Sequence, residues 1–304
     1  FEILMHQIQS VDKICQNFID KPDCFQLDNL NLVRDDFKIL MKKLQREMKS
    51  LSVNKIKVSC FGRTSNGKST LMNAILSKEL IPTGLGQTTS CFISIEGTDS
   101  DELSAVLTTE GGEEIECDIK SIHDLSSAFS DSKTSFGSII RIKYPKKLCP
   151  LLDSDIILYD SPGIDDSDVS DYYIKKYCLD SDIFFYVCNS ESSLMKIEKD
   201  FFLSVYRKIA KPNIFVLFNR WDQCIDSKDS ELLVKQHREK ISELQYQLKR
   251  ADASNLDNMI YFISSKHSLD SKINGNFEDG SVLNKNFKQF EDFLGQTIKS
   301  NSIS

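Results

Sequence analysis

The sequence lacks the cysteine pattern of a zinc-binding or disulfide-rich protein. None of its nine cysteines forms a Cys-x-x-Cys pair, and its four histidines show no metal-ligand spacing. We therefore predict no zinc site, and the odd, unpatterned set of thiols indicates reduced cysteines in a cytosolic protein. The cysteines are Cys15, Cys24, Cys60, Cys91, Cys117, Cys149, Cys178, Cys188 and Cys224, and the histidines are His6, His123, His237 and His267.

Long apolar runs are missing as well. The longest, residues 183–188 and 214–218, have the length of strands and fall far short of the roughly 18 residues that a membrane-spanning helix needs. We predict neither a spanning segment nor a signal peptide. Because the chain begins with Phe1 rather than Met, we expect it to be a fragment, with any membrane anchor outside it.

Positive charge is also scarce. The net charge is −7, the isoelectric point is about 5.3, and no dense basic block stands out. This balance argues against nucleic acid as a principal partner, and we predict none. A length of 304 residues suits one large α/β domain with a smaller module.

A phosphate-binding motif is present at residues 62–69, which match G-x-x-x-x-G-K-[ST]. An apolar strand pattern precedes it and a helical pattern follows it, as the loop of a P-loop NTPase requires. Its glycines let backbone N–H groups face a β-phosphate, while Lys68 reaches the β and γ oxygens and Ser69 ligates Mg²⁺. We assign nucleotide binding here to Ser65, Asn66, Gly67, Lys68, Ser69 and Thr70, with Lys68 and Ser65 also catalytic.

Strand and helix patterns then alternate, which predicts an α/β fold with a mostly parallel, doubly wound sheet. Segments 103–109 and 113–117 flank two glycines and predict a hairpin. Further strands are expected at 91–95, 138–142, 155–160, 183–188, 214–218 and 259–263, with helices at 121–129, 194–209 and 231–249.

Three amphipathic stripes bracket this domain, at residues 4–18, 30–51 and 283–298. They predict a partial α-helical bundle formed by the N- and C-terminal helices, since a sheet already covered by its own helices leaves them little room. The expected boundaries are 1–52 for the N-terminal bundle helices, 53–275 for the nucleotide-binding domain and 276–304 for the C-terminal bundle helix. The alternative is that each helix extends the globular core.

Three motifs after later strands point to a guanine nucleotide, because ligands of such sheets lie at the carboxyl ends of the strands. Residues 160–163 fit D-x-x-G, in which Asp160 holds Mg²⁺ through water and the Gly163 N–H donates to the γ-phosphate. Residues 219–222, Asn-Arg-Trp-Asp, resemble the guanine reader N-K-x-D, and residues 264–266 resemble its S-A-K partner. We assign base binding to Asn219, Arg220, Trp221, Asp222, Ser264 and Lys266.

The details of this reader leave some roles open. Asp222 would accept hydrogen bonds from guanine N1–H and its 2-amino group, a donor pair that adenine lacks. Arg220 replaces the usual lysine and is able to stack on a base. Trp221 either shields the base edge or a dimer surface, or is a core tryptophan in a turn after a strand.

A Gly/Thr-rich loop at 82–90 supplies the last expected element, a threonine that closes over the γ-phosphate and completes the Mg²⁺ shell. We choose Thr89 as metal ligand and catalytic residue, with Thr88 sharing its task. Ile164 follows Gly163 where small GTPases carry a water-orienting glutamine. Hydrolysis must then use backbone groups or residues of the loop 87–89, and we expect it to be slow until that loop is ordered.

Read together, these features resemble the dynamin superfamily, and more closely the mitofusins. The residues that carry the resemblance are the stretches 61–69, 91–99, 160–163, 189–195 and 211–222, the last being the most family-specific. It implies a GTPase domain that uses GTP and Mg²⁺, forms a nucleotide-dependent homodimer through that domain, and has Glu191 and Arg220 in contact across it. Gln87 stands where relatives often carry a histidine, which leaves the hydrolysis rate open.

The resemblance also implies a place in the cell: the mitochondrial outer membrane, with the GTPase domain facing the cytosol and membrane attachment through segments missing from this chain. The expected activity is GTP-driven tethering and fusion of that membrane. Two alternatives stay open. One is a bacterial or plastid dynamin-like protein acting at another membrane, and the other is a GTP-binding tether with negligible hydrolysis.

Overall fold

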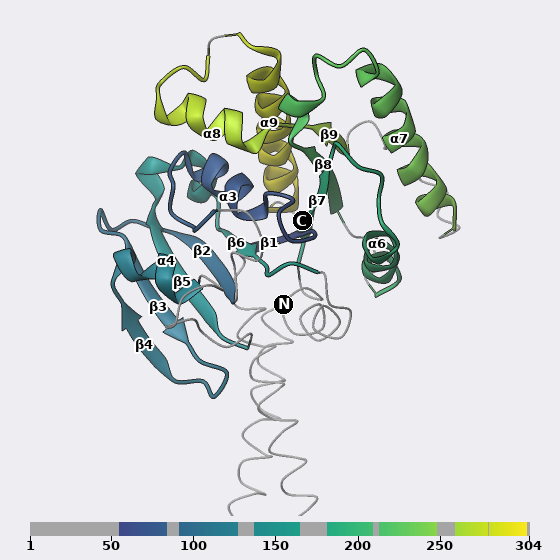
Figure 1. Cartoon of the computed structure of the whole chain (residues 1–304). Coiled ribbons are helices and arrows are strands. Elements are labelled where there is room, and N and C mark those ends of the chain that lie inside the picture. The colour runs from purple at the N-terminus through teal and green to yellow at the C-terminus, as the bar shows by residue number, and fades with distance from the viewer. Residues whose placement is uncertain are drawn as a thin grey trace, which may run out of the picture. The chain divides into compact units, whose positions relative to one another are not determined.

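The chain divides into two compact units, Phe1–Asn54 and Lys55–Ser304. A computed structural model describes residues 55–83, 91–126, 137–164, 181–208, 213–247, 259–278 and 280–302, all of them in the second unit. The N-terminal helices expected within 1–52 lie outside the described residues, as does the loop 84–90. The second unit is an α/β domain built on a single sheet (Figure 1).

The elements of this unit follow the order that the sequence predicts. The strands are β1 Ile56–Phe61, β2 Phe92–Thr98, β3 Ser104–Thr108, β4 Glu114–Cys117, β5 Ile139–Pro145, β6 Ile156–Asp160, β7 Ile183–Asn189, β8 Asn213–Asn219 and β9 Ile260–Phe262. The helices are α3 Lys68–Leu76, α4 Ile122–Ser126, α6 Lys196–Lys208, α7 Ser230–Gln247, α8 Ser265–Ile273 and α9 Val282–Ser302. Short 3-10 turns are η1 Ile119–Ser121, η2 Lys146–Leu148, η3 Pro150–Asp153 and η5 Trp221–Gln223.

The strands form one sheet in the order β4-β3-β5-β2-β6-β1-β7-β8-β9. Five of its eight pairings are parallel, and β2–β6, β3–β4 and β3–β5 are antiparallel. The predicted α/β class with a mostly parallel sheet is therefore confirmed, and so is the hairpin, as β3 and β4. The parallel strands β1, β6, β7, β8 and β9 all end at one edge, which is where the motifs lie.

Successive residues of the central strands point to opposite faces of the sheet, as the pleat requires. Val58, Phe185 and Leu217 belong to one buried cluster, which also contains side chains from α3, α8 and α9. Phe184 and Val216 belong to the other cluster, together with side chains from α6 and α7. The central strands are therefore covered on both faces, which explains their continuous apolar runs.

The C-terminal helix α9 lies on the first of these faces (Figure 1). Its stripe of Phe287, Phe290, Leu294 and Ile298 has no exposed area. The Phe290 ring meets the rings of Phe185, Phe215 and Tyr261 edge-on, with centroids 5.3, 6.0 and 5.7 Å away. The stripe that the sequence assigns to a bundle is thus covered by the sheet. The bundle and the boundaries at 52 and 275 stay predictions.

Replacing Phe290 by alanine should destabilise this unit strongly, because the ring is buried among three aromatic neighbours. We expect a loss of about 3–5 kcal/mol in the free energy of unfolding, measured by chemical denaturation. Gln289→Ala, at the exposed neighbouring position, is the control and should change stability by less than about 0.5 kcal/mol. Similar losses in both variants would mean that α9 does not depend on this packing.

Candidate functional site

The phosphate-binding loop connects β1 to α3, and two of its glycines are required by their surroundings. A Cβ on Gly62 would lie 2.2 Å from the Val187 carbonyl oxygen, and a Cβ on Gly67 would lie 2.3 Å from Asn219 Nδ2. Gly67 also has a φ of 90°, which side chains disfavour. Ser65 has a φ of 64° although it carries a side chain, so this loop stores backbone strain.

Lys68 is the first residue of α3 and is 6% exposed. Its ammonium donates to the carbonyl oxygens of Gly62 and Arg63, both at 3.0 Å. Carbonyl groups of the loop thus hold this charge close to the loop's own backbone. A phosphate entering the loop would meet an ammonium group that is already in place.

Ser69 and Asp160, the two residues predicted to bind a metal that the structure describes, lie in contact. The Ser69 hydroxyl donates to Asp160 Oδ2 at 2.7 Å across the β1–β6 pair. Asp160 has no exposed area, and its Oδ1 has no hydrogen-bond partner. Burial raises the pKa of this carboxyl to about 6, partly offset by the nearby Lys68 charge and by the Ser69 hydroxyl. A buried oxygen without a partner beside a hydroxyl suits a hard cation.

Asn219, the last residue of β8, joins the phosphate-binding loop to the predicted base-binding loops. It is 3% exposed, and its Nδ2 donates to the Asn66 carbonyl oxygen at 2.8 Å. Its Oδ1 accepts from the Ser265 N–H at 2.9 Å. One carboxamide thereby fixes the distance between residues 62–69 and residues 264–266, as a single nucleotide spanning both would require.

Arg220 and Trp221 are the next residues of the predicted guanine-binding motif, and their side chains have different neighbours. Arg220 has a φ of 64°, and its guanidinium donates to the Ser65 carbonyl oxygen at 2.7 Å. The Trp221 ring is 5% exposed and packs on Phe262 with ring centroids 4.9 Å apart. This placement is that of a core tryptophan in a turn, so shielding of the base by Trp221 stays a prediction without direct support.

Asp222, Ser264 and Lys266 complete the predicted base site. Asp222 is half-buried in η5, where Gln223 Nε2 donates to its Oδ2. Ser264 is fully buried and its hydroxyl caps α8 by accepting from the His267 N–H. The Lys266 side chain is 65% exposed, and its ammonium pairs with Asp270 at 2.9 Å, which raises its pKa. The Lys266 side chain therefore lies at the surface.

The D-x-x-G loop meets the phosphate-binding loop directly. The Ile164 N–H donates to the Gly62 carbonyl oxygen at 3.3 Å, which brings Gly163 beside the loop. The Ile164 side chain is 3% exposed and belongs to the apolar cluster that contains Phe61. This position therefore contributes no polar group to orient water. Thr88, Thr89 and Gln87 lie outside the described residues, and Thr70 is half-buried on α3.

Glu191 and Arg220, which the resemblance pairs across two copies, face each other within one chain. The Arg220 guanidinium and the Glu191 carboxylate are 3.9 Å apart, with side-chain exposures of 37% and 43%. An exposed pair at this distance contributes at most about 1 kcal/mol. Contact between copies stays a prediction, and it would have to replace this pairing.

Two side chains that contact the predicted site residues or the strands beside them are not predicted from the sequence. Glu198, in the first turn of α6, accepts a hydrogen bond from the Asn66 side chain at 3.1 Å. His237 on α7 is 5% exposed, stacks on Phe218 with centroids 4.1 Å apart, and has its Nε2 3.0 Å from the Ser190 carbonyl oxygen. An acidic residue opening a helix indicates only a cap, and a lone histidine in a polar helix carries no signal.

The fold and this site define a P-loop GTPase domain. The family model for the Dynamin family matches residues 58–220. The chain therefore belongs to the dynamin family. A solved bacterial dynamin pair, described as oligomerised and as a mechanism for long-range sensing and tethering of membranes, shares the fold with a TM-score of 0.58. It is 18% identical, and the match covers 99% of this chain and 45% of that chain.

Curated relatives confirm the resemblance to mitofusins. Human Mitofusin-2 is 40% identical over 268 residues, which is 85% of this chain and 35% of that protein. The Drosophila melanogaster Transmembrane GTPase Marf is 36% identical over 86% of this chain and 33% of its own length. The Caenorhabditis elegans Transmembrane GTPase fzo-1 is 36% identical over 82% and 32%. This chain spans about a third of these relatives, and none of its described helices is apolar and long enough to span a bilayer.

His237 should make the domain less stable in mild acid. Burial lowers the pKa of its imidazole below 6.5, so the unfolded chain takes up a proton at a higher pH than the folded one. The free energy of unfolding should therefore fall as pH drops below 6.5, by less than about 1.4 kcal/mol per pH unit for one group. His237→Phe keeps a ring on Phe218 and should flatten this slope in denaturation curves at several pH values. An unchanged slope would assign the effect to another group.

Proposed function

We propose that this domain binds GTP together with Mg²⁺ and hydrolyses it. The observation that carries the proposal is the Asn219 carboxamide, which ties the phosphate-binding loop to the Ser265 backbone. A nucleotide has a phosphate end and a base end, and these two hydrogen bonds hold together the segments that we propose bind them. Family membership supports GTP over other nucleotides.

The phosphates would be held by the loop backbone and by Lys68. When γ- and β-phosphate oxygens enter, the Lys68 ammonium exchanges its bonds to the Gly62 and Arg63 carbonyl oxygens for bonds to phosphate. The exchange replaces neutral acceptors by charged ones, which make stronger hydrogen bonds. Ser65, Asn66, Gly67 and Thr70 contribute backbone and hydroxyl donors around the same phosphates.

The residues present fit a magnesium ion. The Ser69 hydroxyl and the buried Asp160 carboxylate supply two oxygens, and Asp160 Oδ1 lacks a partner that a metal-bound water would provide. When bound, Mg²⁺ would neutralise charge that develops on the β- and γ-phosphate oxygens. Asp160 would hold it through water, and Thr89 would add a third ligand.

The base would be selected by Asp222. Its carboxylate is matched to the N1–H and 2-amino donors of guanine, and a buried acceptor left unpaired by adenine would be costly. Ser264 holds the loop before α8 by capping that helix, and backbone N–H groups of this loop would donate to the base oxygen. Arg220 would cover the base plane, Trp221 would support the turn from the core, and Lys266 would lie at the rim.

The attacking water must be oriented without a glutamine at position 164. The Ile164 side chain is in the core, so the Gly163 N–H and residues 87–89, with Thr88 and Thr89, are the groups left for this task. A catalytic constellation that depends on a loop is complete only when the loop is ordered. We therefore expect slow hydrolysis in isolated copies and faster hydrolysis when a second copy orders that loop.

The wider role proposed for the full protein follows the mitofusin relatives. We propose nucleotide-dependent pairing of two GTPase domains as homodimers, which tethers and fuses mitochondrial outer membranes from the cytosolic side. The identities of 36–40% to mitofusin-type relatives favour this reading over a bacterial or plastid membrane. Membrane attachment would reside outside the residues that the structure describes.

A second candidate function is a tether that uses GTP binding only to assemble. The buried side chain at Ile164 favours it, because this position supplies no polar group to orient water. Single-turnover measurement of phosphate release separates the two functions. Release that accelerates with protein concentration supports the enzyme, whereas bound GTP that persists for hours supports the tether.

Asp222→Asn should change which purine the domain prefers. The amide that replaces the carboxylate offers one donor and one acceptor, which match the C2 oxygen and N1–H of xanthine instead of guanine. We expect GTP affinity to fall by about a hundredfold and XTP affinity to rise, measured by equilibrium titration with Mg²⁺. Asp226→Asn, an exposed neighbour, is the control and should change neither. Tight ATP binding by the wild type would overturn the proposed base site.

Contact between Glu191 and Arg220 of different copies can be told apart from their contact within one copy. Glu191→Arg and Arg220→Glu should each weaken dimerisation with GTP or a transition-state analogue, because like charges then face each other. Mixing the two variants restores both ion pairs only if they form between copies. Molecular mass and phosphate release of the mixture are the measurements, after titration has shown that each variant still binds nucleotide. A mixture as weak as its components would assign the pair to one chain.

A further inference from the structure

A buried carboxyl group beside the phosphate-binding loop has no part in the proposed reaction. Glu198 lies in the first turn of α6 and is 4% exposed. Its Oε1 accepts from Asn66 Nδ2 at 3.1 Å, and its Oε2 accepts from the Met195 N–H at 2.8 Å. The second bond caps the helix, a task that surface residues also perform. Helix capping does not require a buried carboxyl group, so the bond to Asn66 is the contact that accounts for the burial of Glu198.

Asn66 is held from three sides. A carboxamide nitrogen has two hydrogens, and those of Asn66 go to Glu198 and to the Val187 carbonyl oxygen, 2.9 Å away. The backbone carbonyl oxygen of Asn66 accepts from the Asn219 side chain. Asn66 also stands between Ser65 and Gly67, which both have positive φ. Asn66 itself does not have a positive φ, and a backbone that alternates in this way aims its N–H groups into one anion-binding concavity. Holding Asn66 in place therefore holds the direction of these N–H groups.

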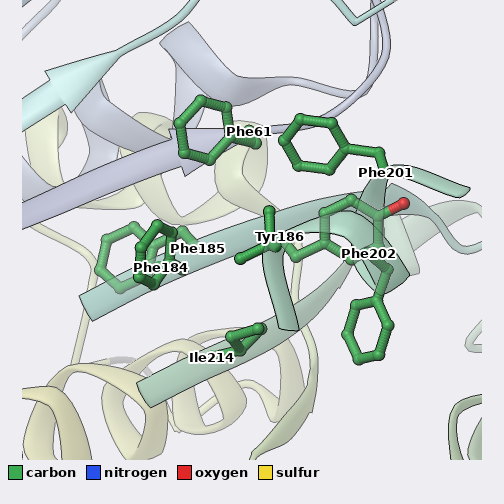
Figure 2. Close-up of a pocket in the computed structure, with 8 residues that line it drawn as sticks. Phe61, Phe184, Phe185, Tyr186, Phe201, Phe202 and Ile214 are labelled. Atoms are coloured by element: carbon green, nitrogen blue, oxygen red, sulfur yellow. The ribbon is translucent and has the colours of Figure 1, made fainter. Parts of the chain in front are cut away.

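The helix that carries Glu198 is a rigid support. Figure 2 shows the rings that pack its inner side against the strands: Phe201 of α6 lies between Phe61 and Tyr186, with centroids 5.3 and 6.0 Å away. The Tyr186 hydroxyl donates to the Glu198 carbonyl oxygen. Phe61 immediately precedes the phosphate-binding loop. The first turn of α6 and the start of the loop are therefore locked together by both rings and hydrogen bonds.

We infer that Glu198 is a positioning residue for phosphate binding, acting through Asn66 on the backbone N–H groups of residues 65–69. The inference rests on the proposed nucleotide site and deepens it. Glu198 touches no phosphate, so its loss should weaken the binding of GDP and GTP alike. The hydrolysis rate at saturating nucleotide should change much less.

The first test is the nucleotide affinity of Glu198→Ala. Losing a charge-assisted hydrogen bond and releasing Asn66 should reduce GDP and GTP-analogue affinity by about tenfold to a hundredfold in equilibrium titrations with Mg²⁺. Glu198→Gln keeps one acceptor and faces the other N–H with a donor, so its loss should be smaller. Asp200→Ala, an exposed carboxylate on the same helix, is the matched control and should bind like the wild type.

A double-mutant cycle separates positioning from helix capping. If Glu198 acts through Asn66, the double variant Glu198→Ala with Asn66→Ala should bind nucleotide no worse than the weaker single variant. If Glu198 only caps α6, the two losses in affinity should multiply, and the inference is then wrong. Should Glu198→Ala not fold, as judged by its melting curve, Glu198→Gln takes its place in the cycle.

The outcome also distinguishes this inference from the proposed function. A wild type that binds guanine nucleotides while Glu198→Ala binds them equally well would overturn the inference and leave the function standing. A wild type that binds no guanine nucleotide would overturn the function first. Equal losses in affinity and in the saturated hydrolysis rate would give Glu198 a role beyond positioning, which also contradicts the inference.

Discussion

The site depends on one buried carboxamide at the carboxyl edge of the sheet. Asn219 donates to the phosphate-binding loop and accepts from the backbone that opens α8, two segments that join it from about 150 and 46 residues away. Parallel strands bring these segments together because β1, β6, β8 and β9 all end at this edge. The register of the strands thus sets how far residues 62–69 lie from residues 264–266. The helices packed on both faces stabilise that register.

Several costs are concentrated at the same edge. Ser65 and Arg220 have positive φ, and each such residue stores energy of about 1–3 kcal/mol. The Asp160 carboxyl group is buried and its Oδ1 has no hydrogen-bond partner, while the buried Lys68 ammonium donates to the carbonyl oxygens of Gly62 and Arg63. Under the proposed function, Asp160 and Lys68 would gain better partners from a cation and from phosphates. The strain and burial at this site lower the stability of the unit, and the packing of α9 and α6 offsets this loss.

The sequence predicts the parts of this structure that depend on local pattern. The loop at 62–69, the strands and the order of the reader motifs follow from residue spacing, because each is set by its own backbone and its immediate flanks. Contacts between distant side chains leave no such pattern. Glu198 meets Asn66 across 132 residues, and the α9 stripe indicates an apolar partner without indicating that the partner is this sheet. A sheet whose faces are covered by its own helices leaves no room for a further helix, which is why the stripe predicts a bundle.

The structure gives a physical reason for an arginine, rather than a lysine, at position 220 of the predicted guanine-binding motif. Arg220 sits at a positive φ that turns its side chain back over the phosphate-binding loop, where it donates to the Ser65 carbonyl oxygen. A lysine ammonium is a compact point charge, whereas the guanidinium is a planar fork whose nitrogens point in different directions. The guanidinium fork donates from one nitrogen to Ser65 while another faces Glu191 at 3.9 Å. Arginine at this position therefore connects the strained loop to the exposed Glu191 carboxylate. If Glu191 took another partner, the Arg220 guanidinium would be free to move, and its hydrogen bond to Ser65 would change with it.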